Sequence, residues 1–157
     1  MQEPQIPFPQ ADSFERVINI CELLNEQELS RNEVTEQYAF DVRQTNYYTD
    51  AARYLGLLDK RRDGVTPTYT LSDTGRRILS LNFKQRQFAY CSCILSHKAF
   101  GDTLREYFEI GLMPSREAII RIMRRSNLYN VGSDSTFERR SSTIKGWVNW
   151  IVGLIKE

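Results

Sequence analysis

Apolar residues recur at intervals of three and four along most of the chain, which is the spacing of one face of an α-helix. The first helix is predicted to begin at the D-x-x-E pattern of Asp12 and Glu15, a typical capping sequence. Its apolar positions are Phe14, Val17, Ile18, Cys21 and Leu24. Ser30 and Glu33 repeat the capping pattern and predict a second, short helix.

Residues 41–58 carry the clearest pattern. Asp41 and Gln44 predict a capped helix over residues 42–55, and Gly56 stands where a left-handed C-terminal residue is expected. The face expected to point inward holds Gln44, Tyr48, Ala51, Ala52 and Leu55. The opposite face holds Arg43, Asn46, Tyr47, Asp50 and Arg53. The two alanines allow the close helix contact that a helix-turn-helix requires.

Two strands are predicted after this helix. Leu57 and Leu58 begin the first, the polar turn D-K-R-R-D-G follows, and T-P-T-Y-T-L-S returns as the second. A helix is expected from Arg76 to Leu81, with Gly75 allowing close packing. This order predicts a mainly α fold with a small β-hairpin, namely a winged helix-turn-helix module over residues 12–82.

The rest of the chain divides into an arm and a helical region. Pro4, Pro7 and Pro9 predict an extended N-terminal arm over residues 1–11, because proline fixes φ and lacks a backbone N–H. After residue 82 the predicted helices are a buried linking helix over Phe83–His97, one over Phe100–Ile110, one opening at Pro114 and Ser115, and a last one from Ser135 to about Val152.

The last helix parallels the central one. A shift of 97 positions places Arg43 on Arg140, Leu55 on Val152 and Gly56 on Gly153. We therefore expect residues 83–157 to form a second helical module that lacks a wing. It is either wingless or, as we favour, a winged helix truncated at its wing in a fragment of a longer protein.

The same parallel sets expectations for individual residues of the last helix. Gly153 is expected to end it, and Leu154 and Ile155 to begin a strand. Ile155 is also expected on the inner stripe, whereas Gly146 and Trp150 are expected on the outer face.

Net charge is only +1, but the charge is unevenly distributed. Residues 1–40 carry two basic and eight acidic side chains, a net charge of −6, whereas residues 121–157 carry seven basic and three acidic, a net charge of +4. Positive charge thus gathers on the segments of the two long helices, which makes a polyanion a plausible partner. No run of 18 apolar residues and no secretory signal are present, and the three cysteines are odd in number. A cytoplasmic protein with reduced thiols, outside the membrane, is expected.

Duplex DNA is the expected partner, since a winged helix presents its third helix to the major groove and its wing to the backbone. Arg43, Gln44 and Asn46 are candidates for contacting bases, with Tyr47 and Arg53 on the same helix. The turn supplies Lys60, Arg61 and Arg62 for phosphates. The last helix adds Arg139, Arg140, Ser142, Thr143 and Lys145. The alternative for the central helix and the turn is an ordinary solvated polar face. The alternative for the last helix is that its side chains only cap and pack.

The residues needed for catalysis are not found. His97 is the single histidine and has no cysteine or carboxylate at ligand spacing, so it is expected at a helix end. The sequence contains no G-x-G-x-x-G, P-loop or G-x-S-x-G motif, and no Asp…(Asp/Glu)-x-Lys set of a metal-dependent nuclease. We expect no enzymatic activity from this chain alone, no catalytic residue, no metal and no cofactor.

Three blocks, R-Q-T-N-Y-Y-T-D-A-A-R-Y-L-G-L-L, Y-T-L-S-D-T-G-R-R-I-L and R-R-S-S-T-I-K-G-W-V-N-W-I-V-G-L-I, resemble the DNA-recognition region of type II (type IIS and nicking) restriction endonucleases. The likeness covers about residues 12–155. It implies tandem winged-helix modules that bind double-stranded DNA sequence-specifically, as the target-recognition domain of a restriction-modification enzyme. The nuclease domain of such enzymes is missing here and would lie C-terminal to this chain.

The resemblance also assigns residues. Its first block matches Arg43, Gln44, Tyr47 and Tyr48, and its second matches Arg140, Ser142, Thr143, Trp147 and Trp150. Two alternatives keep the winged-helix fold but change the function. One is a protein-interaction scaffold whose apolar contact face is formed by Tyr47, Tyr54 and Trp150. The other is a stand-alone transcriptional regulator, which would need to dimerise on a palindromic site.

Overall fold

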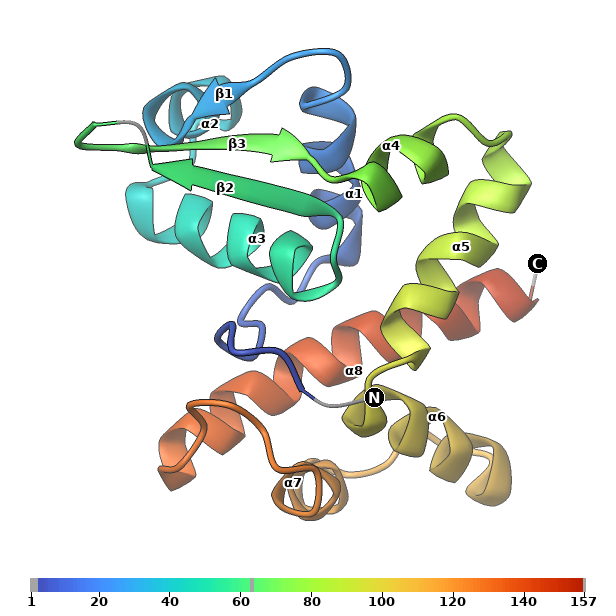
Figure 1. The fold of residues 1–157 in the computed structure, drawn as a ribbon. Helices are drawn as coiled ribbons and strands as arrows, with labels where there is room; N and C mark the ends of the chain where they lie inside the picture. Colours follow the sequence, from blue (N-terminus) through green and yellow to red (C-terminus); the bar gives the residue numbers. More distant parts are fainter. Residues whose placement is uncertain (1–2, 63, 157) are drawn as a thin grey trace.

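The structure is a computed structural model that describes residues 3–62 and 64–156. This part of the chain is mainly α, with eight helices and three short strands (Figure 1), which confirms the predicted class. The elements in chain order are α1 (Phe14–Leu23), β1 (Leu29–Ser30), α2 (Arg31–Tyr38), α3 (Val42–Tyr54), β2 (Leu58–Arg62), β3 (Pro67–Leu71), α4 (Asp73–Leu79), α5 (Phe83–Leu95), α6 (Lys98–Ile110), α7 (Arg116–Arg124) and α8 (Asp134–Lys156).

The strands form one antiparallel sheet in the order β1-β3-β2. The predicted hairpin is present, with Leu58 opposite Leu71 and Arg62 opposite Pro67. Asp63, in the predicted turn, lies outside the described residues. β1 was not predicted, because a two-residue strand has no periodicity of its own. It pairs Leu29 with Tyr69 and so attaches the start of α2 to the hairpin.

The capping residues of α2 and α3 are those the sequence predicts. In α2 the Ser30 hydroxyl accepts from the Glu33 N–H, and in α3 an Asp41 carboxylate oxygen accepts from the Gln44 N–H at 2.7 Å. Gly56 follows α3 with φ 77°, a conformation that costs glycine little. Both helices therefore begin where local chemistry would place them, and α3 also ends next to the predicted glycine.

The start of α1 differs from the prediction. Ser13, and not Asp12, is its N-cap residue, and no side chain caps it. The Asp12 carboxylate instead accepts from the Thr143 hydroxyl at 2.8 Å and from Arg139 Nη1 at 3.0 Å. A long-range contact with α8 has replaced the local cap. The donors of α8 and the backbone N–H groups at the start of α1 compete for the same carboxylate oxygens of Asp12.

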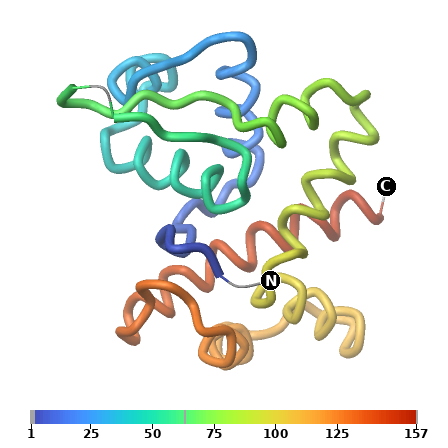
Figure 2. The backbone as a smooth tube through the Cα atoms, in the orientation of Figure 1, coloured from blue at the N-terminus to red at the C-terminus, as the bar shows by residue number. Residues whose placement is uncertain are grey.

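The N-terminal arm forms neither helix nor strand over the described residues 3–13, and it bends at Gln5 and Ile6. It does not project from the molecule. Phe8 is 2% exposed, and its ring stacks on Phe100 of α6 and meets Tyr54 of α3 edge-on, with centroids 5.5 Å apart in both pairs. Figure 2 shows this segment passing between the helices of the first half and α8. Residues 1 and 2 of the predicted arm lie outside the described residues.

The second half is built around α8. Trp147 is fully buried against Phe14 and Phe100, and its indole N–H donates to the Ala11 carbonyl at 2.7 Å. The predicted end of this helix at Gly153 is wrong, because the backbone continues helically to Lys156. No strand forms in the described residues 83–156, so Leu154 and Ile155 begin none, and Ile155 is 58% exposed.

Three further expectations for the second half are wrong. Gly146 does not face outward: it lies against the backbone of Asp12, whose carbonyl oxygen a Cβ atom would overlap. Trp150 is half-buried, with its ring 4.6 Å from that of Phe14. The linking helix α5 is buried on one side only, since Phe83 and Phe88 are 72% and 60% exposed. In each case a neighbouring element, which local periodicity does not specify, decides the exposure.

Candidate nucleic-acid interface

Helix α3 is held firmly from its inner side. Thr45, Thr49, Ala51 and Ala52 are fully buried there. The hydroxyls of Thr35 in α2 and Thr45 in α3 are 2.7 Å apart and share a hydrogen bond, which ties the two helices together. The small buried side chains allow this close approach, as predicted from the two alanines. The outward face of α3 is therefore presented by a fixed scaffold.

The outward face of α3 carries most of the side chains predicted to contact bases. Arg43 is exposed, whereas Asn46 and Tyr47 are half-buried. Arg53 is half-buried and pairs with Asp50, with Nη1 and Oδ1 3.0 Å apart. Gln44 is partly engaged in the cap, where its Oε1 accepts from the Asp41 N–H at 3.2 Å. Arg43, Asn46 and Tyr47 thus lie in the first two turns of α3 without a side-chain hydrogen bond in the described part of the chain.

Positive charge gathers where α3 meets the hairpin. Lys60 follows the buried Leu58 by two residues, so the two side chains lie on the same side of β2. Burial is the largest cause of a lowered pKa for Lys60, and the charges of Arg53, Arg62 and Arg31 lower it further, while Asp50 opposes them. We call these residues the α3–hairpin cluster: Arg31, Asp50, Arg53, Lys60 and Arg62.

Arg31 is the member of this cluster that sequence analysis missed. It is the first residue of α2, and its Nε is buried without a hydrogen-bond partner. The pairing of β1 with β3 carries it to the hairpin. Since β1 is only two residues long, the sequence contains no pattern from which this placement could have been inferred.

The other predicted hairpin cations differ in their surroundings. Arg61 points away from the cluster and binds Glu28 through two hydrogen bonds, of 3.2 and 2.9 Å. The hydrogen bonding from Arg61 and the charge of Arg61 lower the pKa of Glu28. Arg62 is exposed near the end of β2. Lys60 and Arg62 therefore lie in the α3–hairpin cluster, whereas Arg61 pairs with the segment before β1.

The residues of α8 that were predicted to bind DNA have different surroundings. Thr143 is fully buried, donates to Asp12 and accepts from the Ala11 N–H at 3.0 Å. Arg139 forms an ion pair with Asp12 at 3.0 Å. Ser142 is half-buried and Lys145 is exposed on the helix surface. Arg140 is within electrostatic range of the α3 face, where its charge interacts with Tyr47 and Asp50.

One family matches most of the chain. The description of this family is a domain of unknown function, DUF7226, and the match covers residues 16–156. The chain belongs to the DUF7226 family. No curated protein and no solved structure matches the chain. In residues 3–62 and 64–156 of this DUF7226 protein, no helix is both long and apolar enough to cross a membrane.

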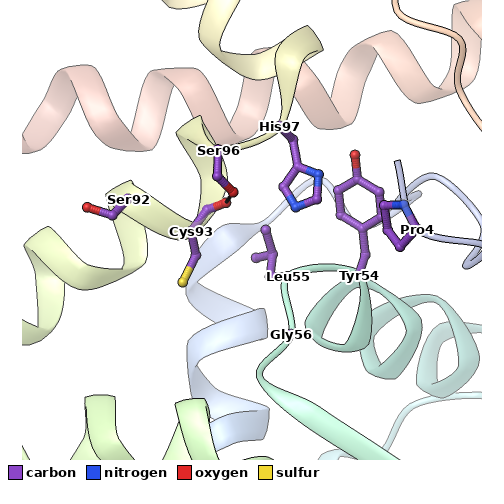
Figure 3. A pocket seen from close by; sticks show the side chains of 8 residues that line it. All are labelled: Pro4, Tyr54, Leu55, Gly56, Ser92, Cys93, Ser96 and His97. Carbon is purple, nitrogen blue, oxygen red and sulfur yellow. Dashed lines mark hydrogen bonds between the residues drawn. The ribbon is translucent and has the colours of Figure 1, made fainter. Parts of the chain in front are cut away.

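A small apolar pocket lies where the two halves of the DUF7226 protein meet (Figure 3). Its volume is about 430 Å³, and it is lined by Pro4, Tyr54, Leu55, Gly56, Ser92, Cys93, Ser96 and His97. His97 immediately precedes α6, which confirms its predicted position at a helix end. Its ring stacks on Tyr54 with centroids 4.1 Å apart, and Nδ1 lies 3.4 Å from Glu3 Oε2.

Tyr54 and Glu3 beside this pocket are hydrogen-bonded to each other, whereas His97 Nδ1 is buried without a hydrogen-bond partner. The Tyr54 hydroxyl donates to the Glu3 carboxylate, and burial together with the Glu3 charge raises the pKa of Tyr54. Within the described part of the DUF7226 chain, no group of three His, Cys, Asp or Glu side chains could hold a metal ion. The three cysteines all lie in that part and are free thiols. The pocket is thus an apolar hollow at the junction of the two halves.

Proposed function

We propose that this DUF7226 chain is a winged helix-turn-helix protein that binds double-stranded DNA sequence-specifically, as the target-recognition part of a type II restriction endonuclease. The order of elements supports the fold assignment. A helix, an edge strand, two helices in close contact and a β-hairpin follow one another, with the strands ordered β1-β3-β2. In a winged helix, α3 would enter the major groove and the β2–β3 hairpin would be the wing.

The observation that carries the proposal is the α3–hairpin cluster. Three arginines, Arg31, Arg53 and Arg62, and the single carboxylate of Asp50 act on Lys60, and the repulsion from the arginines adds to burial in lowering the pKa of Lys60. Like charges brought together by rigid elements raise the free energy of the unbound protein. A polyanion relieves that repulsion, and the release of condensed counterions from DNA adds to the binding free energy. The exposed Arg43 and half-buried Asn46 on the adjacent turns are suited to pair with guanine and adenine.

The residues expected to form the contact face of a protein-interaction scaffold do not form one exposed surface. Tyr54 is only 4% exposed and lies at the junction of the two halves, while Trp150 packs on Phe14. Tyr47 alone remains on the outward face of α3. The regulator alternative requires a dimer on a palindromic site, so the mass of the protein–DNA complex separates it from a monomeric recognition domain.

The test is selection of duplexes from a randomised pool, followed by titration of an enriched duplex at several salt concentrations. We expect one enriched sequence and an affinity whose logarithm falls linearly with the logarithm of salt concentration, with a slope of about −0.9 for each neutralised phosphate. The double variant Lys60→Ala/Arg62→Ala should have a slope shallower by about 2. Lys84→Ala/Arg121→Ala is the matched control, because it removes two exposed cations on α5 and α7. Absence of salt-dependent affinity for every duplex would rule out the proposal.

A further inference from the structure

Two neighbouring arginines of α8 have opposite surroundings. Arg139 is paired: its Nη1 lies 3.0 and 3.2 Å from the two carboxylate oxygens of Asp12. Arg140 is unpaired at two atoms, since its Nε and Nη1 are buried and have no hydrogen-bond partner. An arginine stays charged at any physiological pH, and unpaired buried donors on a charged group are costly. The structure therefore contains a guanidinium group that lacks an acceptor.

Arg140 lies within electrostatic range of the outward side of α3. Its charge interacts with the Tyr47 side chain and the Asp50 carboxylate, both on that face. Asp50 also interacts with Lys60 of the hairpin. In Figure 1, α3 lies between the hairpin and the N-terminal part of α8. Lys60 of the α3–hairpin cluster and Arg140 of α8 thus both interact with Asp50 on α3.

The arm fixes this position of Arg140. The Ser13 N–H donates to the Tyr48 hydroxyl of α3 at 3.2 Å. Two residues earlier, Ala11 is bonded to α8 by both its N–H and its carbonyl oxygen. Gly146 allows the backbone of α8 to rest directly on Asp12. Because α3 and α8 are both attached to residues 11–13, the backbone at Arg140 keeps its position relative to α3.

We propose that Arg140 binds a backbone phosphate of the duplex whose bases α3 contacts, so that α8 extends the α3 interface through this residue and is not a second base-contacting helix. The inference rests on the proposed function. A helix in the major groove has a row of phosphates on either side, and a guanidinium fork matches phosphate oxygens in shape and charge. Nε and Nη1 are buried, but the Arg140 residue as a whole is only half-buried, so an anion would reach the side chain at its exposed part. Arg139 and Thr143 are excluded because Asp12 and Ala11 already occupy them.

The test compares three full-length variants, Arg140→Met, Arg140→Lys and Arg139→Met, on the enriched duplex and on a scrambled duplex. Methionine keeps a similar length of side chain and removes the charge. We expect Arg140→Met to bind both duplexes about tenfold more weakly, the equivalent of one charge-assisted hydrogen bond, with a salt slope shallower by about 1. Arg140→Lys should keep the slope and recover part of the affinity. Arg139→Met should keep both the affinity and the salt slope of the unmodified protein, because an exposed ion pair contributes little to stability.

Stability supplies a second readout. If Arg140 is unpaired without DNA, Arg140→Met should leave the thermal midpoint of the free protein unchanged or raise it. A lowered midpoint with unchanged binding would show that Arg140 is structural and overturn the inference. Loss of affinity for the enriched duplex alone would mean that Arg140 contacts bases, which also overturns it. If Arg140→Met does not fold, the affinity of Arg140→Lys for the enriched and scrambled duplexes is measured in its place. Failure of the unmodified protein to bind any duplex would instead reject the proposed function.

Discussion

The hydroxyl group of Tyr54 donates to both carboxylate oxygens of Glu3, at 2.8 and 2.7 Å. Tyr54 is the last residue of α3, and Glu3 belongs to the N-terminal arm, so this contact joins two segments 51 residues apart. The Glu3 side chain is only 11% exposed, which means that it depends on Tyr54 and His97 in place of water.

Replacing Tyr54 by phenylalanine should therefore destabilise the protein. The ring would still fill its place against Phe8 and His97, but the buried carboxylate of Glu3 would lose its donor, at a cost of about 1–3 kcal/mol. The midpoint of urea unfolding at pH 7 measures this loss. Tyr129→Phe is the control, because Tyr129 is 44% exposed. Equal midpoints for the two variants would contradict the importance of the Tyr54–Glu3 contact.

Two glycines of α8 should respond oppositely to alanine. At Gly146 the new Cβ would overlap the carbonyl oxygen of Asp12, so Gly146→Ala should destabilise the protein by about 1–3 kcal/mol. Gly153 lies in the same helix with no atom within 4 Å of such a Cβ, so Gly153→Ala should stabilise it by about 0.5–1 kcal/mol. Thermal unfolding of both variants checks the pair. Stabilisation by Gly146→Ala would mean that α8 does not rest on Asp12.

The buried thiol of Cys21 should make stability fall in alkaline solution. Burial is the main cause that raises its pKa from 9.0 to about 12. The folded protein therefore keeps the thiol protonated while the unfolded chain loses the proton, so this contribution is complete below pH 9 and is lost as the pH rises from 9 towards 12. The loss is roughly 1 kcal/mol per pH unit over that range.

Urea unfolding at a series of pH values from 7 to about 10.5 tests this linkage. Cys21→Ala should show a smaller fall in stability above pH 9 than the unmodified protein. Val17→Ala, which truncates another buried side chain of α1 and keeps the thiol, should retain the full fall. Parallel curves for all three proteins would show that Cys21 does not contribute to the alkaline dependence.

Arg43 and Lys60 should affect DNA binding in different ways. Arg43 is exposed in the first turn of α3, so Arg43→Ala should relax the preference for one base pair, at a cost of about 1–3 kcal/mol on the enriched duplex only. Lys60 belongs to the α3–hairpin cluster, so Lys60→Ala should weaken binding to enriched and scrambled duplexes alike. Competition titrations with both duplexes measure the difference. Identical effects of the two substitutions would contradict the assignment of α3 to base contacts.

Local chemistry predicted much of the first half from sequence. Asp41 with Gln44 and the following glycine specify where α3 begins and ends, and alternation around Tyr69 specifies β3. These signals lie within a few residues of the structure they determine. The hairpin itself was predicted, whereas its register, with Lys60 opposite Tyr69 and Arg62 opposite Pro67, was not.

Long-range contacts account for what the sequence did not predict. Asp12 resembles a helix cap, but its partner Thr143 lies 131 residues away. Gly153 resembles a helix end, yet α8 continues because Ile151 and Val152 are already buried in the core and the glycine has no positive φ. The different surroundings of Arg139 and Arg140 depend on the same contact with the arm, so no local pattern could separate them.

The position of the arm bears on how the two halves could be recombined. Ala11 gives its N–H to Thr143 and its carbonyl oxygen to the Trp147 indole, and Phe8 packs on Phe100, so the core of the second half is completed by residues from the start of the chain. A hybrid that joins residues 1–82 of this chain to the second half of a divergent relative must therefore match two surfaces at once. The two halves should therefore be exchanged together. Replacing the second half alone would remove Trp147, whose indole N–H binds the Ala11 carbonyl of the arm.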